Sequence, residues 1–139
     1  MIDLSEEDVK KYAQMAAEAM SKAYAPYSKH TVGAVVVDEN NVPHVGCNVE
    51  NSVYPTCVCA EVNAITTMVY SGAREIKAVF VVGPSEENLV TPCGNCRQTI
   101  REFTSGDALI YSVWKDGRIG RVQSLNELLP DSFGPDHLK

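Results

Sequence analysis

Three cysteines and one glutamate are the residues of this sequence whose types and spacing could do chemistry. Cys59 and Glu61 are separated by a single residue, and Cys93 and Cys96 form a Cys-x-x-Cys pair directly after Pro92. Three thiolates can hold a zinc ion tetrahedrally and leave its fourth corner for water. Zinc lowers the pKa of such a water from ~15.7 towards 7. A carboxylate at Glu61, close to the water but not bound to the metal, could then carry the proton as a general base.

The elements that must position these residues are two helices. The first begins at Cys59 and continues with apolar residues at helical spacing, namely Val62, Ala64, Ile65, Met68 and Val69. The second runs from Cys93 to about Phe103 and presents Cys93 and Cys96, three residues apart, on one side of its first turn. Helix starts carry partial positive charge, which stabilises thiolates. The spacing therefore predicts three ligands supplied by two helix starts.

A closed structural site is an alternative interpretation of the same cysteines. Structural zinc is normally four-coordinate with sulfur, so this site would use Cys57, Cys59, Cys93 and Cys96 and would stabilise the fold without catalysis. However, Cys-x-Cys is a poor clamp, and Glu61 would have no purpose beside a closed site. We expect Cys57 to be a core thiol or a pocket wall and Cys47 to be a buried strand residue.

Two simpler roles also remain open for these residues. A redox function of Cys93 and Cys96 alone would leave Cys59 and Glu61 unexplained. Glu61 as a plain helix residue is a further alternative, because an acid in the first turn is favoured by the helix dipole alone.

Composition and charge limit the partners. The chain has 139 residues and a formal net charge of −6, with 12 scattered Lys and Arg residues, which argues against a nucleic acid polymer and favours a small substrate. No apolar run approaches the ~20 residues of a membrane span. Residues 1–7 are acidic where a signal peptide would be basic, so we expect a cytoplasmic protein with no membrane contact. Its length favours one domain over residues 1–139.

The order of helices and strands predicts an α/β layered domain. After a helix that Ser5 caps and that stops before Pro26, we expect strands at 32–38, 42–49, 76–82, 108–113 and 119–122 and a short helix at 125–129. Crossovers through the two cysteine helices would make the third and fourth strands parallel to their predecessors. Both cysteine helices would then begin at the carboxyl edge of the sheet, where sites lie in open α/β folds.

The motifs together resemble the small, homotetrameric, zinc-dependent cytidine deaminases, over nearly the whole chain from residue 25 to residue 135. Cys-x-Glu followed by Pro-Cys-x-x-Cys is the zinc-deaminase signature. Further matching pieces are Val32-Gly33-Ala34, residues 46–51, Tyr54-Pro55 and residues 127–130. The resemblance implies a three-layer α/β/α domain with a five-stranded mixed sheet and one Zn²⁺ per subunit. It also implies hydrolytic deamination of cytidine or deoxycytidine in pyrimidine salvage, with active sites shared between subunits.

The family's nucleoside contacts fall on particular residues of this sequence. Asn48 and Glu50 resemble the pair that hydrogen-bonds a ribose hydroxyl, and two polar residues two apart at a strand end would point the same way. Without the resemblance, they could simply be exposed polar residues. The backbone N–H of Ala60 resembles the group that binds the exocyclic oxygen of the base. Tyr54 and Phe133 resemble residues lent across subunit interfaces, although Phe133 could equally be ordinary packing of the C-terminal segment.

One departure from the family concerns the metal. Val62 stands where the family usually has an Arg that hydrogen-bonds the zinc thiolates. Three thiolates on Zn²⁺ leave a net charge of −1, so the loss of that Arg should make the metal a weaker acid. Arg97 or backbone amides could compensate.

Two further departures concern the substrate. His30 replaces the usual aromatic before Val-Gly-Ala, where it could alter how the base is held, and Ser52 replaces a usual Ala. The runner-up substrate is therefore a modified or antibiotic cytosine nucleoside such as blasticidin S, whose deaminases also lack the Arg. Those enzymes typically lack the Asn48 and Glu50 pattern, so cytidine or deoxycytidine is preferred.

Overall fold

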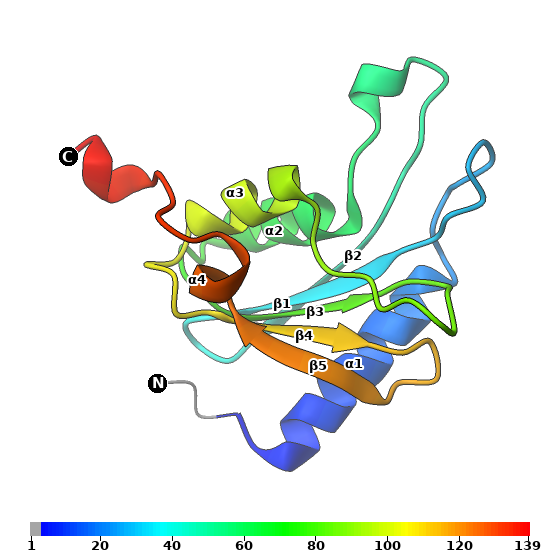
Figure 1. Cartoon of the computed structure of the whole chain (residues 1–139), viewed down its shortest axis with the longest axis horizontal. Helices are drawn as coiled ribbons and strands as arrows, with labels where there is room; N and C mark the ends of the chain where they lie inside the picture. The colour runs from blue at the N-terminus through cyan, green and yellow to red at the C-terminus, as the bar shows by residue number, and fades with distance from the viewer. Residues whose placement is uncertain (1–3) are drawn as a thin grey trace.

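The structure is a computed structural model that describes residues 4–139 (Figure 1). Its helices and strands are α1 (Glu6–Met20), β1 (Gly33–Asp38), β2 (Pro43–Cys47), α2 (Ala60–Ser71), β3 (Ile76–Val82), α3 (Gly94–Arg101), β4 (Leu109–Val113), β5 (Ile119–Ser124) and α4 (Leu125–Leu128), with two short 3-10 helices, η1 (Tyr54–Thr56) and η2 (Pro135–His137). The predicted strands and helices are confirmed, with ends shifted by a few residues. The first three residues of the acidic opening stretch lie outside the described part.

One mixed sheet with the strand order β2-β1-β3-β4-β5 organises the chain. Strand β1 is antiparallel to both β2 and β3, while β3 is parallel to β4 and β4 is antiparallel to β5. Strands β2, β3 and β4 therefore run in the same direction, as the crossovers through α2 and α3 predict. Their carboxyl ends lie at one edge of the sheet, and α2 and α3 begin beyond that edge.

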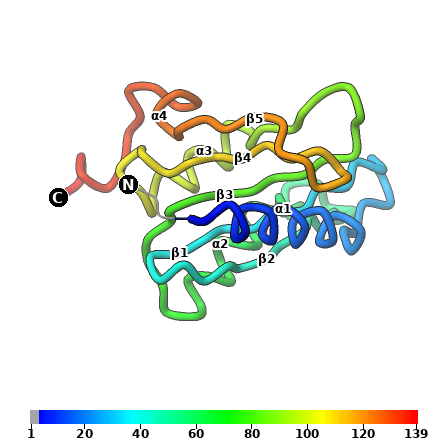
Figure 2. The backbone as a smooth tube through the Cα atoms, turned by 90° about the horizontal axis from the view of Figure 1, so that it is seen from below, coloured from blue at the N-terminus to red at the C-terminus, as the bar shows by residue number. Residues whose placement is uncertain are grey.

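Helices cover both faces of the sheet and make the three layers predicted from the sequence (Figures 1 and 2). Helix α1 packs on one face, where its buried residues join a core with β1, β3 and β4: Tyr12, Ala13, Ala16, Val35, Val37, Ala78, Phe80, Val82, Tyr111 and Val113. Helices α2, α3 and α4 contribute to a second core on the other face, which includes Ala64, Ile65, Met68, Ile100 and Leu125. Within residues 4–139, no helix combines the length and apolar content needed to cross a membrane.

Two glycines allow helix backbones to lie directly on the sheet. A Cβ atom at Gly33 would fall on the carbonyl oxygen of Ala16 in α1. A Cβ atom at Gly46 would lie 2.6 Å from the carbonyl oxygen of Ala60 and 2.5 Å from the backbone nitrogen of Ala64 in α2. The position of the start of α2 is therefore set by direct backbone contact with β2.

Local capping residues fix the helix ends. The Ser5 side chain accepts a hydrogen bond of 3.0 Å from the backbone N–H of Asp8, as expected for an N-cap. Helix α2 ends at Gly72, whose φ of 105° is readily adopted only by glycine. Ser124 and Glu127 form a complete capping box at the start of α4.

Candidate active site

The thiols of Cys59, Cys93 and Cys96 come together at the carboxyl edge of the sheet. Their three Sγ atoms all lie within 4.8 Å of one another. Cys59 is the N-cap residue of α2, Cys93 is the N-cap residue of α3, and Cys96 lies in the first turn of α3. Both N-cap sulfurs therefore lie at helix starts, whose partial positive charge stabilises thiolates. Three clustered sulfurs fit a zinc ion with three protein ligands.

The three thiols differ in burial and in acidity. Cys96 is buried, Cys59 is half-buried and Cys93 is exposed. Burial raises the pKa of Cys59 and Cys96. Burial also acts to raise the pKa of Cys93, but the backbone N–H groups of Cys96 and Asn95 and the neighbouring thiols outweigh it and lower that pKa overall. The exposed thiol is thus the most acidic of the three, and bound zinc would deprotonate all of them.

Glu61 lies beside the thiols in the first turn of α2, with only 4% of its surface exposed. Burial raises the pKa of its carboxyl group, while its own backbone N–H and the Cys96 thiol act in the opposite direction. A carboxyl group with a raised pKa is a stronger base than an ordinary carboxylate, which favours its accepting a proton and later returning it. Its position and its environment therefore suit proton transfer rather than metal ligation.

The start of α2 also offers backbone donors next to the thiols. Ala60 is the first helical residue and is fully buried. The first N–H groups of a helix have no partner within the helix and carry its partial positive charge. An oxygen of a bound ring could therefore accept a hydrogen bond from Ala60.

The side chains of Asn48 and Glu50 both turn towards the loop that precedes β1. The Asn48 Oδ1 atom accepts from the backbone N–H of Val32, and its Nδ2 atom donates to the carbonyl oxygen of His30, each at 2.8 Å. The Glu50 carboxylate accepts from residues 27–28. The two residues do point the same way, as predicted, but they are not free polar side chains. His30, placed by the sequence near the base, has an exposed side chain.

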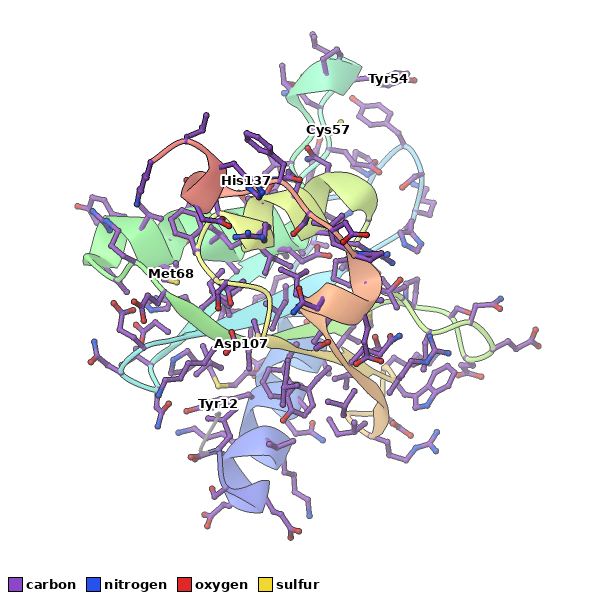
Figure 3. All side chains as sticks on the ribbon, turned by 60° about the vertical axis from the view of Figure 1, so that its left-hand side comes forward. Tyr12, Tyr54, Cys57, Met68, Asp107 and His137 are labelled. Carbon is purple, nitrogen blue, oxygen red and sulfur yellow. The ribbon has the colours of Figure 1, made fainter. Side chains whose placement is uncertain are left out.

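The aromatic residues Tyr54 and Phe133 lie at exposed positions. Tyr54 is 71% exposed on η1, in a loop that extends away from the sheet (Figure 3), and its ring meets Tyr27 edge-on with a centroid separation of 6.5 Å. Phe133 is 56% exposed in the C-terminal segment (residues 130–139), and its ring stacks on His137 at 5.0 Å. The Gln98 side chain in α3 donates to the Phe133 carbonyl oxygen at 2.9 Å. Packing on His137 thus leaves more than half of Phe133 uncovered.

The two remaining cysteines differ from expectation. Cys57 is exposed on the projecting loop (Figure 3), so the prediction of a core thiol is wrong, while the alternative of a pocket wall stays a prediction. Its Sγ atom accepts from the backbone N–H of Asn51 at 3.2 Å and does not belong to the thiol cluster. Geometry therefore gives no support to a closed site of four thiolates. Cys47 is a strand residue, as predicted, but it lies at the end of β2 and is only partly buried, because β2 is an edge strand.

Arg97 does not replace the arginine that is missing at Val62. Its guanidinium donates to the carbonyl oxygens of Pro92 at 2.6 Å and Leu128 at 2.7 Å and to the Thr91 hydroxyl at 3.1 Å. Arg97 therefore fastens the loop before α3 to the end of α4. Compensation by backbone amides fits better, because such amides lower the pKa of the exposed thiol.

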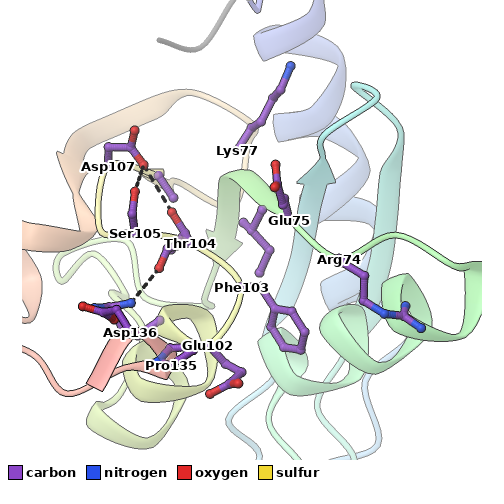
Figure 4. A pocket seen from close by; sticks show the side chains of 13 residues that line it. Arg74, Glu75, Lys77, Glu102, Phe103, Thr104, Ser105, Asp107, Pro135 and Asp136 are labelled. Atoms are coloured by element: carbon purple, nitrogen blue, oxygen red, sulfur yellow. Dashed lines mark hydrogen bonds and ion pairs between the residues drawn. The ribbon is translucent and has the colours of Figure 1, made fainter. Parts of the chain in front are cut away.

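A large cavity lies elsewhere in the chain. It has a volume of about 710 Å³ and lies between the start of β3, the loop from α3 to β4, and η2 (Figure 4). Asp107 on its wall accepts hydrogen bonds from the hydroxyls of Thr104 at 3.3 Å and Ser105 at 3.2 Å. None of the site residues predicted from the sequence lines this cavity.

Comparison with known proteins decides the family. Residues 6–112 match the sequence model of the cytidine and deoxycytidylate deaminase zinc-binding region. The chain belongs to this deaminase family. A cytidine deaminase from Sporosarcina psychrophila is 40% identical over 131 residues, which cover 94% of this chain and 95% of the relative. The crystal structure of cytidine deaminase from Burkholderia pseudomallei is similar with a TM-score of 0.83 and 36% identity, covering 94% of this chain and all of the other.

Membership of the deaminase family bears on the thiol cluster. The matched range contains all three clustered cysteines and Glu61. The matched family model is that of a zinc-binding region, and this chain has a group of thiols able to hold a metal ion. The zinc cofactor and the enzymatic class predicted from the sequence are thereby confirmed.

Proposed function

We propose that this chain hydrolyses cytidine or deoxycytidine to uridine or deoxyuridine and releases ammonia, with zinc held by Cys59, Cys93 and Cys96. One observation carries the proposal: three Sγ atoms within 4.8 Å of one another lie beside the buried carboxyl group of Glu61, in a chain of the deaminase family. Relatives named cytidine deaminase match most of the chain and support the substrate. The antibiotic nucleoside considered from the sequence is not favoured by these relatives.

The chain's own residues supply the proton transfers. When bound, zinc with three protein ligands makes water acidic enough to lose a proton near pH 7. Glu61 takes a proton from water and delivers it to the ring nitrogen of the pyrimidine. It then helps to move a proton to the departing amine, so that water is consumed and ammonia leaves. The backbone N–H of Ala60 holds the ring by donating to its exocyclic oxygen.

The sugar is held by Asn48 and Glu50 in this proposal. Both side chains lie just beyond the end of β2, and α2 with Cys59 follows along the chain. Each side chain is fixed by hydrogen bonds to the loop before β1, which prepares it for binding without the cost of ordering it. His30, in the same loop, would lie near the base.

The proposed assembly is a homotetramer in which subunits share active sites. Large exposed apolar side chains support an interface, since soluble monomers rarely gather them on one loop. Val49, Val53 and Tyr54 are all exposed around the projecting loop, and Phe133 is exposed on the C-terminal segment. Tyr54 and Phe133 would then reach the substrate of a neighbouring subunit.

Three other expectations stay predictions. Action within pyrimidine salvage follows from the proposed substrate. A cytoplasmic location fits five free cysteines, which persist in reducing compartments. A single domain over residues 1–139 fits the one sheet to which the described helices attach.

The proposal is tested with purified protein of measured zinc content. We expect cytidine absorbance to fall and ammonia to be released. In Glu61→Ala the rates of absorbance loss and of ammonia release should both fall to background, while one zinc per chain stays bound. Zinc-loaded protein that converts neither cytidine nor deoxycytidine would show the substrate to be wrong. Full activity of Glu61→Ala would show that the proton carrier is another group.

A further inference from the structure

Ser28 occupies a special place in the loop before β1. Its Oγ atom donates to the Glu50 carboxylate and accepts from the backbone N–H of His30 at 3.0 Å. Lys29, between Ser28 and His30, has a φ of 62°, which is uncommon for a residue other than glycine. The serine hydroxyl therefore bridges a strained turn to a carboxylate that lies far away in the sequence.

The Glu50 carboxylate uses its two oxygens differently. The Oε1 atom accepts from the backbone N–H groups of Tyr27 at 3.0 Å and Ser28 at 3.2 Å, whereas Oε2 accepts only from the Ser28 hydroxyl among the described residues. The backbone on either side is also fixed: Glu50 N–H donates to the Tyr24 carbonyl oxygen at 2.8 Å, and Tyr24 N–H donates to the Asn48 carbonyl oxygen at 3.0 Å. A carboxylate oxygen accepts about two hydrogen bonds, so Oε2 keeps one acceptor position.

We propose that Ser28 is a positioning residue for nucleoside binding, because its hydroxyl holds Glu50 so that Oε2 can accept a hydrogen bond from a sugar hydroxyl. This inference rests on the sugar-binding role proposed for Glu50 above. Ser28 itself needs no contact with the nucleoside. The Ser28 bond is also the largest cause that lowers the pKa of Glu50, as expected for a hydrogen bond donated to the ionised carboxylate.

The chemistry of the hydroxyl explains why serine is needed at this position. One hydroxyl can donate to Glu50 and accept from His30 at the same time, and a hydrogen bond to a charged acceptor is stronger than a neutral one. Alanine would lose both contacts and leave Oε2 free to move. The backbone donors to Oε1 would remain, because they belong to the main chain. The expected loss is therefore partial and confined to sugar binding.

The test compares Ser28→Ala, Ser28→Thr and Glu50→Gln in the zinc-loaded full chain. For Ser28→Ala with cytidine we expect KM to rise about three- to tenfold at nearly constant kcat, a size typical of one hydrogen bond. Ser28→Thr keeps the hydroxyl and should restore a KM within about twofold of the original. Calorimetric titration with uridine should show the same loss of affinity for Ser28→Ala, with no turnover involved.

A substrate control isolates the sugar hydroxyl. The sugar of 2′,3′-dideoxycytidine has no hydroxyl on C2′ or C3′. With this substrate, Ser28→Ala and the unsubstituted protein should have the same KM. An equal KM increase with cytidine and with dideoxycytidine would overturn the inference, as would a loss of kcat alone. Should Ser28→Ala fail to fold, Ser28→Cys, which keeps the size but weakens the donor, carries the same expectation.

The Glu50→Gln variant separates this inference from the proposed function. If that variant raises KM for cytidine while Ser28→Ala does not, Ser28 does no positioning and the sugar site still stands. If Glu50→Gln leaves KM unchanged in an active enzyme, the proposed sugar site is wrong and the role of Ser28 is overturned with it.

Discussion

Replacing Gly46 with alanine tests whether α2 must lie directly on β2 for the metal site to form. The new Cβ atom would lie 2.5 Å from the backbone nitrogen of Ala64 and 2.6 Å from the carbonyl oxygen of Ala60. Both are backbone atoms, so no side-chain rotation can make room. Ordinary van der Waals contact begins near 3.4 Å, so α2 would have to retreat by about 0.9 Å (3.4 minus 2.5).

Such a displacement has two expected costs. Overpacking of this kind typically destabilises a protein by about 1–3 kcal/mol, and we expect the metal-free chain to lose about 2 kcal/mol of unfolding free energy. Helix α2 carries Cys59, whereas the other two clustered sulfurs belong to α3. Because ligand distances tolerate only about 0.2 Å, zinc affinity should fall by about tenfold or more.

The assays are urea unfolding of the metal-free protein and zinc competition with a chromogenic chelator. Gly94→Ala is the matched control, because a Cβ atom there meets nothing within 4 Å, and we expect nearly unchanged stability and zinc affinity. Gly33→Ala presses on α1 at the opposite face and should lower stability without changing zinc affinity. The reasoning would be refuted if Gly46→Ala bound zinc as tightly as the unsubstituted chain, or if Gly33→Ala weakened zinc binding equally.

Three more substitutions test other contacts. Cys57→Ala should keep one zinc per chain and normal activity, and loss of the metal from this variant would support the closed site of four thiolates. The buried Asp38 carboxylate lies 2.8 Å from the His44 ring, and its pKa is lowered in the folded state. The stability that the Asp38 carboxylate contributes is therefore present above its unfolded pKa of ~3.9 and is lost as the pH falls through its folded pKa. Asp38→Asn should therefore lower the unfolding free energy by about 2 kcal/mol at pH 7. In urea titrations the difference in unfolding free energy between the variant and the unsubstituted protein should narrow below about pH 3.9, and a difference that stays constant would contradict this. The buried Arg101 guanidinium holds Asp136 at 2.7 Å, so Arg101→Met should speed proteolysis of the C-terminal segment, and unchanged cleavage would argue against an anchoring role.

The thiol cluster could be predicted from the sequence because local rules and topology converge on it. The spacing of Cys93 and Cys96 places both sulfurs on one helical turn, whatever the surroundings. Parallel crossovers then bring the starts of α2 and α3 to the same sheet edge, which adds Cys59. Glu61 follows because it shares the first turn of α2.

The partners of the long polar side chains could not be predicted in the same way. Arg97 bonds Leu128, and Glu50 bonds Ser28, across loops whose paths depend on the whole fold. Several acceptors are within reach of any arginine, so sequence spacing alone does not select one. The exposure of Cys57 was missed for a related reason: the loop around η1 leaves the body of the chain, and no apolar periodicity marks that departure.

Zinc held between the first turns of α2 and α3 would also change how these helices open. Helix ends normally fray, but here the fraying turns would have to break coordination bonds first. Helix α1, attached mainly by apolar contacts on the opposite face, has no such restraint. Amide hydrogen exchange in the first turns of α2 and α3 should therefore slow as free zinc increases, while exchange in α1 stays indifferent to the metal.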